Sequence, residues 1–137
     1  MILIDTGPLV ALFDPQDALH GRCKTVLRTF RDPLSTTVPV LTEVFQLLPP
    51  DTLGAIRLRE FLLRGGVAVW FLDQASLERS FALMERYADH PMDLADASLV
   101  TAAEALNTQR IFTIDRNDFS TYRMRRGHRN EGFEIVG

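Results

Sequence analysis

Four acidic residues that are far apart in the chain have the types and positions that catalysis would need. They are Asp5, Glu43, Asp96 and Asp115. Asp5 and Asp115 each end a largely apolar run, whereas Glu43 and Asp96 share the apolar side of a predicted helix. Burying an acid costs several kcal/mol unless a positive group neutralises its charge. If these four converge in the fold, they predict a site for a divalent cation and, with it, phosphodiester chemistry.

The expected cation is Mg²⁺ or Mn²⁺, because the candidate ligands are carboxylate oxygens without a cluster of Cys and His. Cys23 is the only cysteine, and no Cys/His spacing suggests zinc. Mg²⁺ normally keeps several waters and connects one or two carboxylates to a substrate phosphate. Two such ions about 4 Å apart would activate a water and stabilise the leaving oxygen, and a single ion is the alternative. The predicted chemistry is metal-assisted hydrolysis.

Two of the four acids are predicted to lie on inward helix faces. Glu43 follows Val40 by three positions and precedes Leu47 by four, and such positions share a helix face. Asp96 shares its side of a helix with Leu99 and other apolar residues. The alternative for Glu43 is a plain surface position, and the alternative for Asp96 is an interaction with the helix dipole, typically about 0.3–1 kcal/mol.

Residues next to these acids are candidates for a supporting role. The hydroxyls of Thr6 and Thr113 can orient the adjacent carboxylates or a bound water, although each residue also suits a turn or a strand. Asp93 directly precedes a predicted helix and is explained equally well as its N-cap or as a second site residue. Asp5 and Asp115, taken singly, can also be explained as cap or turn residues.

Hydrophobic periodicity and turn residues predict strands that alternate with helices. The predicted strands cover residues 1–5, 34–38, 67–72, 110–114 and 133–136. The predicted helices cover residues 8–13, 17–30, 39–48, 52–64, 74–87 and 94–107. Asp51 and Asp73 are the expected N-caps of two of these helices, and Trp70 and Phe71 are expected to fill the core.

This alternation predicts an α/β fold in which helices cover both faces of a short, mainly parallel sheet of four to five strands. At 137 residues, the chain is most simply a single domain spanning residues 1–137. Functional sites in such sheets lie beyond the carboxyl ends of the strands, where the strand order reverses. Asp5 and Asp115 are both expected at that edge.

Composition excludes several classes of protein. Hydrophobic residues make up 46% and charged residues 24% of the chain, which is typical of a globular domain rather than a disordered one. No apolar run approaches the roughly 20 residues that span a bilayer, and the N-terminus does not resemble a signal peptide. We therefore expect a cytoplasmic protein without membrane contact.

The basic residues are unevenly distributed. The net charge is −3, yet 14 of the 15 basic residues are arginine and six of these fall between Arg110 and Arg129. A local basic patch matters more for phosphate binding than the charge of the whole chain. The segment from Arg123 to Arg129 is either a solvated surface or a surface for RNA or a partner. His20, His90 and His128 are expected at the surface rather than as general bases.

The chain resembles the PIN-domain ribonucleases and, within them, the VapC-type toxins of type II toxin–antitoxin systems. The resemblance covers nearly the whole chain and depends on the order and spacing of four motifs. They are Ile4-Asp5-Thr6-Gly7-Pro8-Leu9-Val10-Ala11-Leu12-Phe13, Thr42-Glu43-Val44, Met92-Asp93-Leu94-Ala95-Asp96-Ala97-Ser98-Leu99-Val100, and Phe112-Thr113-Ile114-Asp115-Arg116-Asn117-Asp118-Phe119.

The resemblance implies a three-layer α/β/α, RNase H-like fold and a metal-dependent ribonuclease. It implies that Asp5, Glu43, Asp96 and Asp115 bind Mg²⁺ or Mn²⁺ and catalyse hydrolysis, with Asp118 as an extra acid beside Asp93. It also implies an RNA substrate, a homodimer, and a small cognate VapB-like antitoxin that inserts into the active-site groove.

Two rival functions remain to be compared with this one. An aspartyl phosphatase or phosphotransferase would use Asp5 as a nucleophile, but it generally needs a second nearby acid and a lysine close to the phosphate. The only lysine is Lys24, which lies within a predicted helix. A non-catalytic PIN domain that only binds RNA or protein would be expected to lack one of the site acids, and all four are present.

Overall fold

The central feature of the computed structural model, which describes all of residues 1–137, is a five-stranded parallel sheet. Its strand order is β3-β2-β1-β4-β7. These strands are β1 (Ile2–Ile4), β2 (Leu34–Thr37), β3 (Val67–Trp70), β4 (Arg110–Phe112) and β7 (Glu134–Val136). The α/β class and the number of strands predicted from the sequence are confirmed.

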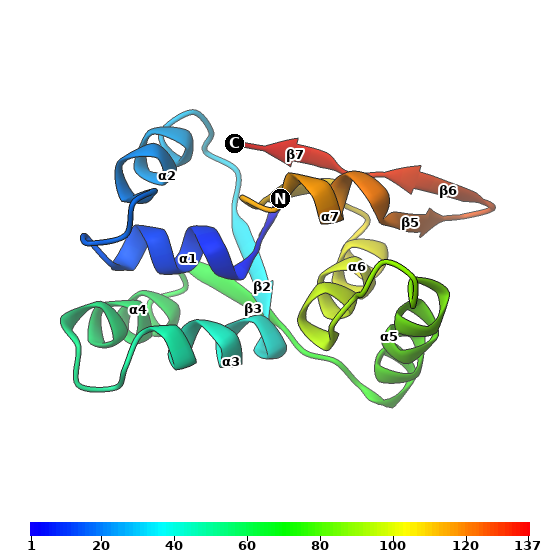
Figure 1. Ribbon diagram of the computed structural model, residues 1–137, viewed down its shortest axis with the longest axis horizontal. Coiled ribbons are helices and arrows are strands. Elements are labelled where there is room, and N and C mark those ends of the chain that lie inside the picture. The colour runs from blue at the N-terminus through cyan, green and yellow to red at the C-terminus, as the bar shows by residue number, and fades with distance from the viewer.

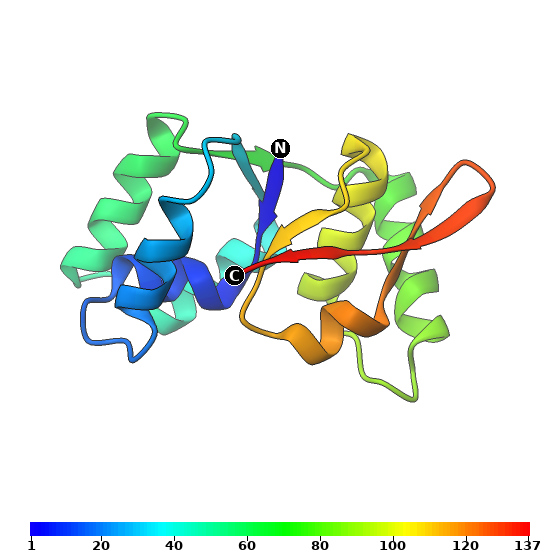
Figure 2. The ribbon, with the colours of Figure 1, turned by 90° about the horizontal axis from the view of Figure 1, so that it is seen from above.

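Helices cover the sheet on both sides. They are α1 (Thr6–Phe13), α2 (His20–Leu27), α3 (Val38–Leu47), α4 (Leu53–Leu63), α5 (Gln74–Arg86), α6 (Leu94–Leu106) and α7 (Arg116–Thr121). Figures 1 and 2 show α1, α2 and α4 on one side of the sheet and α5 and α6 on the other. Helix α3 packs against both α1 and α6, so it joins the two outer layers near the end of β2.

The strand order reverses at β1, which lies in the middle of the sheet. The chain adds β2 and β3 on one side of β1 and then returns to place β4 on the other side. Leu3 of β1 is in register with both Ser35 and Ile111. The carboxyl ends of β1 and β4 are therefore neighbours at the point of reversal, which is where parallel sheets form their sites.

Strand β2 is buried although three of its four residues carry hydroxyl groups. Thr36 donates to the carbonyl oxygen of Ile4 at 2.9 Å, and Ser35 donates to that of Ala68 at 3.2 Å. The Thr37 and Ser98 hydroxyls are 2.6 Å apart and share a hydrogen bond. Because a buried hydroxyl is tolerated only when it is bonded, these contacts tie β2 to β1, β3 and α6.

Several predicted helix ends are wrong by a few residues. Helix α2 is confined to His20–Leu27 instead of residues 17–30, because Asp17 accepts a hydrogen bond from the backbone N–H of Leu19 in the preceding turn. Thr52, and not Asp51, caps α4, since its hydroxyl accepts from the N–H of Ala55. Asp73 caps α5, as predicted.

The strands are also shorter than predicted. Strand β3 ends at Trp70, so Phe71 lies outside the strand and is 69% exposed instead of filling the core. Strand β4 ends at Phe112, and Asp115 begins a helix rather than ending a strand. In each case, the residues that follow the last sheet pairing turn away from the sheet, and hydrophobicity alone does not mark that point.

Two C-terminal elements were not predicted: α7 and a two-stranded antiparallel hairpin. The hairpin consists of β5 (Arg123–Arg126) and β6 (Arg129–Gly132). Its only apolar residue is Met124, and α7 has only six residues, so neither element carries a hydrophobic period long enough to detect. None of the seven helices has both the length and the hydropathy to cross a bilayer.

Truncation of the core face of α6 should destabilise the fold. Leu99 is fully buried, and we expect Leu99→Ala to lower the free energy of unfolding by about 2–5 kcal/mol, because it removes apolar burial and leaves a cavity. Leu47→Ala is the matched control. Because Leu47 is 61% exposed, this substitution should change the free energy of unfolding by no more than about 0.5 kcal/mol. Urea unfolding followed by circular dichroism measures both, and equal effects would contradict this packing.

Candidate metal centre at the switch point of the sheet

Asp5 lies where β1 passes into α1. Its Oδ1 accepts from the backbone N–H of Thr6 at 2.7 Å, and its Oδ2 accepts from the Thr113 hydroxyl at 2.9 Å. The side chain is therefore held by the first residue of α1 and by the residue that follows β4, and Asp5 is only 8% exposed. Thr113 also accepts a bond from the N–H of Asp115 at 3.0 Å. The threonine thus connects two of the predicted site residues.

Three predicted site residues are helix N-caps. Asp5 caps α1, Asp93 caps α6 and Asp115 caps α7. Asp93 Oδ1 accepts from the N–H of Asp96 at 2.8 Å, and Asp115 Oδ1 accepts from the N–H of Asp118 at 3.0 Å. Capping and a role in a site are therefore compatible, since each cap uses one carboxylate oxygen and the second oxygens of Asp93 and Asp115 accept no hydrogen bond.

Glu43 lies at the margin of the buried face of α3. Its Oε1 accepts from the Thr6 hydroxyl at 3.5 Å, which brings α3 next to the start of α1. The buried stripe of α3 is Val40, Val44 and Leu48, so the prediction that Leu47 shares the inward side is wrong. The buried position is Leu48 rather than Leu47, and one position along a helix corresponds to a rotation of about 100°. Glu43 is therefore half-buried and faces the other acids.

Asp96 lies in the first turn of α6 and is held by a tyrosine that sequence reasoning missed. The Tyr122 hydroxyl is 3.2 Å from Asp96 Oδ2 and 3.3 Å from the carbonyl oxygen of Pro91. Tyr122 is completely buried, and the rings of Tyr87 and Phe119 pack edge-on against it. This packing fixes the hydroxyl, and thereby the carboxylate that it contacts.

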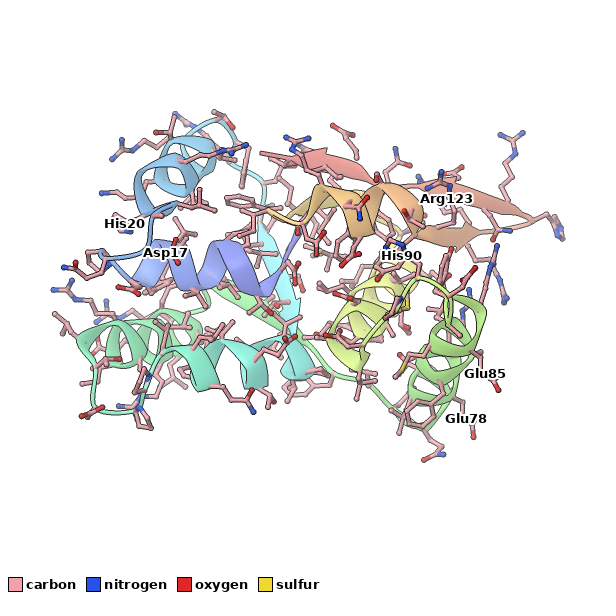
Figure 3. All side chains as sticks on the ribbon, in the orientation of Figure 1. Asp17, His20, Glu78, Glu85, His90 and Arg123 are labelled. Atoms are coloured by element: carbon pink, nitrogen blue, oxygen red, sulfur yellow. The ribbon has the colours of Figure 1, made fainter.

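Asp118 lies one turn along α7 and is paired with His90. His90 Nε2 is 2.7 Å from Asp118 Oδ1, and the His90 ring packs edge-on against Tyr122. The expectation that His90 is an unrelated surface residue is therefore wrong. His20 and Asp17, by contrast, lie at the end of α1 away from this group (Figure 3). No spacing in the sequence indicates the pair, because 28 positions separate its members.

The acids act on one another electrostatically. Burial, followed by the charges of Asp115 and Asp93, raises the pKa of Asp5 to about 6. Burial, followed by the charges of Asp93, Asp5 and Asp118, raises the pKa of Asp96 to about 8. Burial raises the pKa of Glu43 as well, with contributions from Asp93 and Asp5.

The pKa of Asp115 is also raised, first by burial and then by Asp118. The neighbouring His90 ring acts against this rise at Asp115 and is also paired with Asp118. The six acids thus form a concentration of negative charge that the neighbouring side chains scarcely neutralise. Such a cluster favours a bound cation.

The donor set suits a hard divalent cation, although no three acids already surround a common point as metal ligands do. Mg²⁺ normally binds one or two carboxylates directly and retains waters, so it does not require a closed shell of protein ligands. Free carboxylate oxygens of Glu43, Asp96 and Asp115, which accept no hydrogen bond, remain available. The residues therefore fit Mg²⁺ or Mn²⁺ in type and in charge.

An open groove of about 430 Å³ is lined by two of these acids. Glu43 and Asp93 stand on its walls, between the start of α3 and the start of α6. A more enclosed cavity of about 410 Å³, between α1, α2 and α4, is mainly apolar and has no acidic residue in its lining. The groove, and not the enclosed cavity, is therefore the candidate substrate site, because two of the acids lie in its lining.

Comparisons with known proteins identify the family of this chain. The model of the PIN domain family matches residues 2–123. The chain is 31% identical over 129 residues to Ribonuclease VapC26 of Mycobacterium tuberculosis, a match that covers 89% of this chain and 92% of that protein. The chain belongs to the PIN domain family, and the family that its motifs resemble is thus confirmed.

Solved structures show the same fold. One is a crystal structure of VapC20 from Mycobacterium tuberculosis, described as a sarcin-ricin loop cleaving toxin, with a TM-score of 0.73 and 21% identity. That match covers 81% of this chain and 87% of VapC20. Another is a toxin–antitoxin complex from Klebsiella pneumoniae, with a TM-score of 0.69, 22% identity, and coverage of 88% and 92% of the two chains.

Neutralising Asp96 should stabilise the metal-free protein at alkaline pH. Folding raises the pKa of Asp96 from 3.8 to about 8. The contribution of the Asp96 carboxyl to stability is therefore fully present below pH about 4 and is lost as the pH rises towards 8. We expect Asp96→Asn, in the presence of EDTA, to raise the free energy of unfolding at pH about 8 by roughly 1–2 kcal/mol, a value reduced by partial solvent screening.

Asp73→Asn is the matched control for this experiment. Hydrogen bonds from Ser76 lower the pKa of Asp73, so loss of its charge should not stabilise the protein at the same pH. Urea unfolding between pH about 4 and 8 measures both variants. A destabilised Asp96→Asn protein at pH about 8 would contradict the electrostatic description of the site.

Proposed function

We propose that this protein is a VapC-type ribonuclease that hydrolyses phosphodiester bonds of RNA with Mg²⁺ or Mn²⁺ held by Asp5, Glu43, Asp96 and Asp115. The observation that carries the proposal is the gathering of these acids, from four different elements, at the switch point of the sheet without a neutralising lysine or arginine. The similarity to Ribonuclease VapC26 supports the same activity.

Each carboxylate has a stated task in this proposal. Asp5, buried and held by Thr6 and Thr113, provides the rigid base of the site, and Asp96 and Glu43 face it from α6 and α3. When bound, the metal ion lowers the pKa of a water and offsets charge on the phosphate. The hydrogen bonds from Tyr122 to Asp96 and from Thr6 to Glu43 keep those carboxylates in place.

The phosphotransferase alternative is poorly supported by the contacts of Asp5. Both of its oxygens accept hydrogen bonds, so neither is presented freely as a nucleophile. Lys24 lies in α2 and lines the apolar cavity rather than the groove beside the acids. Hydrolysis by an activated water requires neither group.

The proposed partners are an RNA substrate, a small VapB-like antitoxin and a second copy of the chain. The fold shared with a toxin–antitoxin complex supports an antitoxin partner. An antitoxin segment that enters the groove would meet Glu43 and Asp93, so we propose that it carries a basic residue there. The homodimer is proposed from the family resemblance.

Asp5→Asn tests the proposed function. We expect the variant to fold normally, because asparagine can keep the bond from the Thr6 N–H, and to lose RNA cleavage by at least about 100-fold. The assay follows cleavage of labelled RNA in Mg²⁺ or Mn²⁺, and EDTA should abolish the wild-type activity. Asp73→Asn, at an exposed cap that does not line the groove, should cleave like the wild type.

Undiminished cleavage by the pure Asp5→Asn protein would contradict the metal mechanism. Binding of RNA without any cleavage in Mn²⁺ would instead favour the non-catalytic alternative. A stable phosphoryl group on Asp5, seen by mass spectrometry, would favour a phosphotransferase.

A further inference from the structure

The Arg-rich hairpin of β5 and β6 is a separate part of the fold. It forms its own two-stranded antiparallel sheet and reaches the edge of the molecule beyond α5 and α6 (Figures 1 and 2). The match to the PIN domain family ends at Arg123, the first residue of β5. The acid site and the core do not use the hairpin's arginine side chains.

The two faces of the hairpin differ. The inner face packs on the protein through Met124, which is completely buried. Arg126, on the same face, pairs with Glu131 and donates a hydrogen bond to Asn107 at the end of α6. Since successive residues of a strand alternate between faces, Arg123 and Arg125 point outward. The residues opposite them on β6 are Gly132 and Asn130, so the outer face carries no acid.

The hairpin holds positive charge that the protein leaves unneutralised. The side chains of Arg125 and Arg129 are exposed and form no hydrogen bond or ion pair. The side chain of Arg123 donates only to backbone carbonyl oxygens at the end of α7. Arg129 lies directly opposite Arg126 across the two strands, but Arg126 is already paired with Glu131. A bound anion would neutralise the charge that remains on Arg125 and Arg129.

The hairpin is connected directly to the acid site. Asp115 is the N-cap of α7, and Tyr122, which contacts Asp96, is followed at once by β5. Helix α7 has six residues and is therefore about 9 Å long. Figure 3 shows Arg123 at the end of α7 where His90 also lies. A polyanion a few units long can reach from the site to the hairpin.

We propose that the β5–β6 hairpin binds the phosphate backbone of the RNA substrate beside the acid site, an inference that rests on the proposed function. The acid cluster itself repels phosphates, so affinity for a polyanion has to come from cations outside it. Arginine binds phosphate with paired N–H donors, which suits this task. A protein partner is less favoured, because none of the large exposed apolar side chains belongs to the hairpin.

The test compares two double variants with the same change in charge. The hairpin variant carries Arg125→Gln and Arg129→Gln. The control variant carries Arg59→Gln and Arg64→Gln, which change exposed arginines in α4 and at its C-terminal end, at the opposite end of the molecule (Figure 1). Fluorescence anisotropy of a labelled single-stranded RNA of mixed sequence, in EDTA, measures binding without cleavage. Circular dichroism and thermal melting check that each protein is folded.

We expect the hairpin variant to bind this RNA roughly 10-fold more weakly at about 0.1 M salt, and the α4 variant to bind like the wild type. The slope of log affinity against log salt concentration should fall by about 1.4, or about 0.7 for each lost phosphate contact on a single strand. In Mn²⁺, the KM for RNA should rise similarly while kcat stays within about twofold. Arg125→Lys with Arg129→Lys should restore most of the binding, because it keeps the charge.

The outcomes separate this inference from the proposed function. If the wild type binds and cleaves RNA and the two glutamine variants behave alike, the hairpin inference is wrong and the proposed function stands. If the wild type neither binds nor cleaves RNA, the proposed function fails and the inference fails with it. A hairpin variant with normal RNA binding but weakened binding of a protein inhibitor would also overturn the inference in favour of a protein surface.

Discussion

The mutual repulsion of carboxylates gathered in one place is the constraint to which the rest of the structure responds. Each of the six acids has an oxygen held by a specific donor: a helix N-terminus for Asp5, Asp93 and Asp115, and a side chain for the others. These bonds favour the charged forms only in part, since burial and neighbouring charge still raise the pKa of Asp5 to about 6 and of Asp96 to about 8. The packed core supplies the free energy that keeps the acids together.

The same elements serve stability and function because the caps belong to the helices that form the layers. Helix α6 buries an almost continuous surface of apolar and small residues, its N-cap Asp93 lines the groove, and its first turn holds Asp96 against Tyr122. Helix α7 begins with Asp115 at the acid site and leads to Tyr122 and Arg123. The acids proposed to bind a cation and the basic hairpin proposed to bind phosphate are thus joined by one short helix.

Sequence reasoning succeeded where a residue pattern is local and repeated. The central parallel sheet, the caps at Asp73 and Asp93 and the long helices all follow from hydrophobic period and turn chemistry. It was wrong where competing caps lie side by side, as with Asp51 and Thr52, because propensity does not decide between neighbours. It missed α7 and the hairpin because their short, mainly polar sequences contain no repeated apolar spacing.

The sequence by itself determined that acids follow two sheet strands and stand at the starts or sides of two helices, since these positions depend on neighbouring residues. Only the tertiary structure decided which atoms meet: Thr113 with Asp5 across 108 positions, His90 with Asp118 across 28, and Tyr122 with Asp96 across 26. It also decided that Leu47 faces solvent. The physical reason is that contacts between distant segments depend on how whole layers pack, and packing at that range leaves no period in the chain.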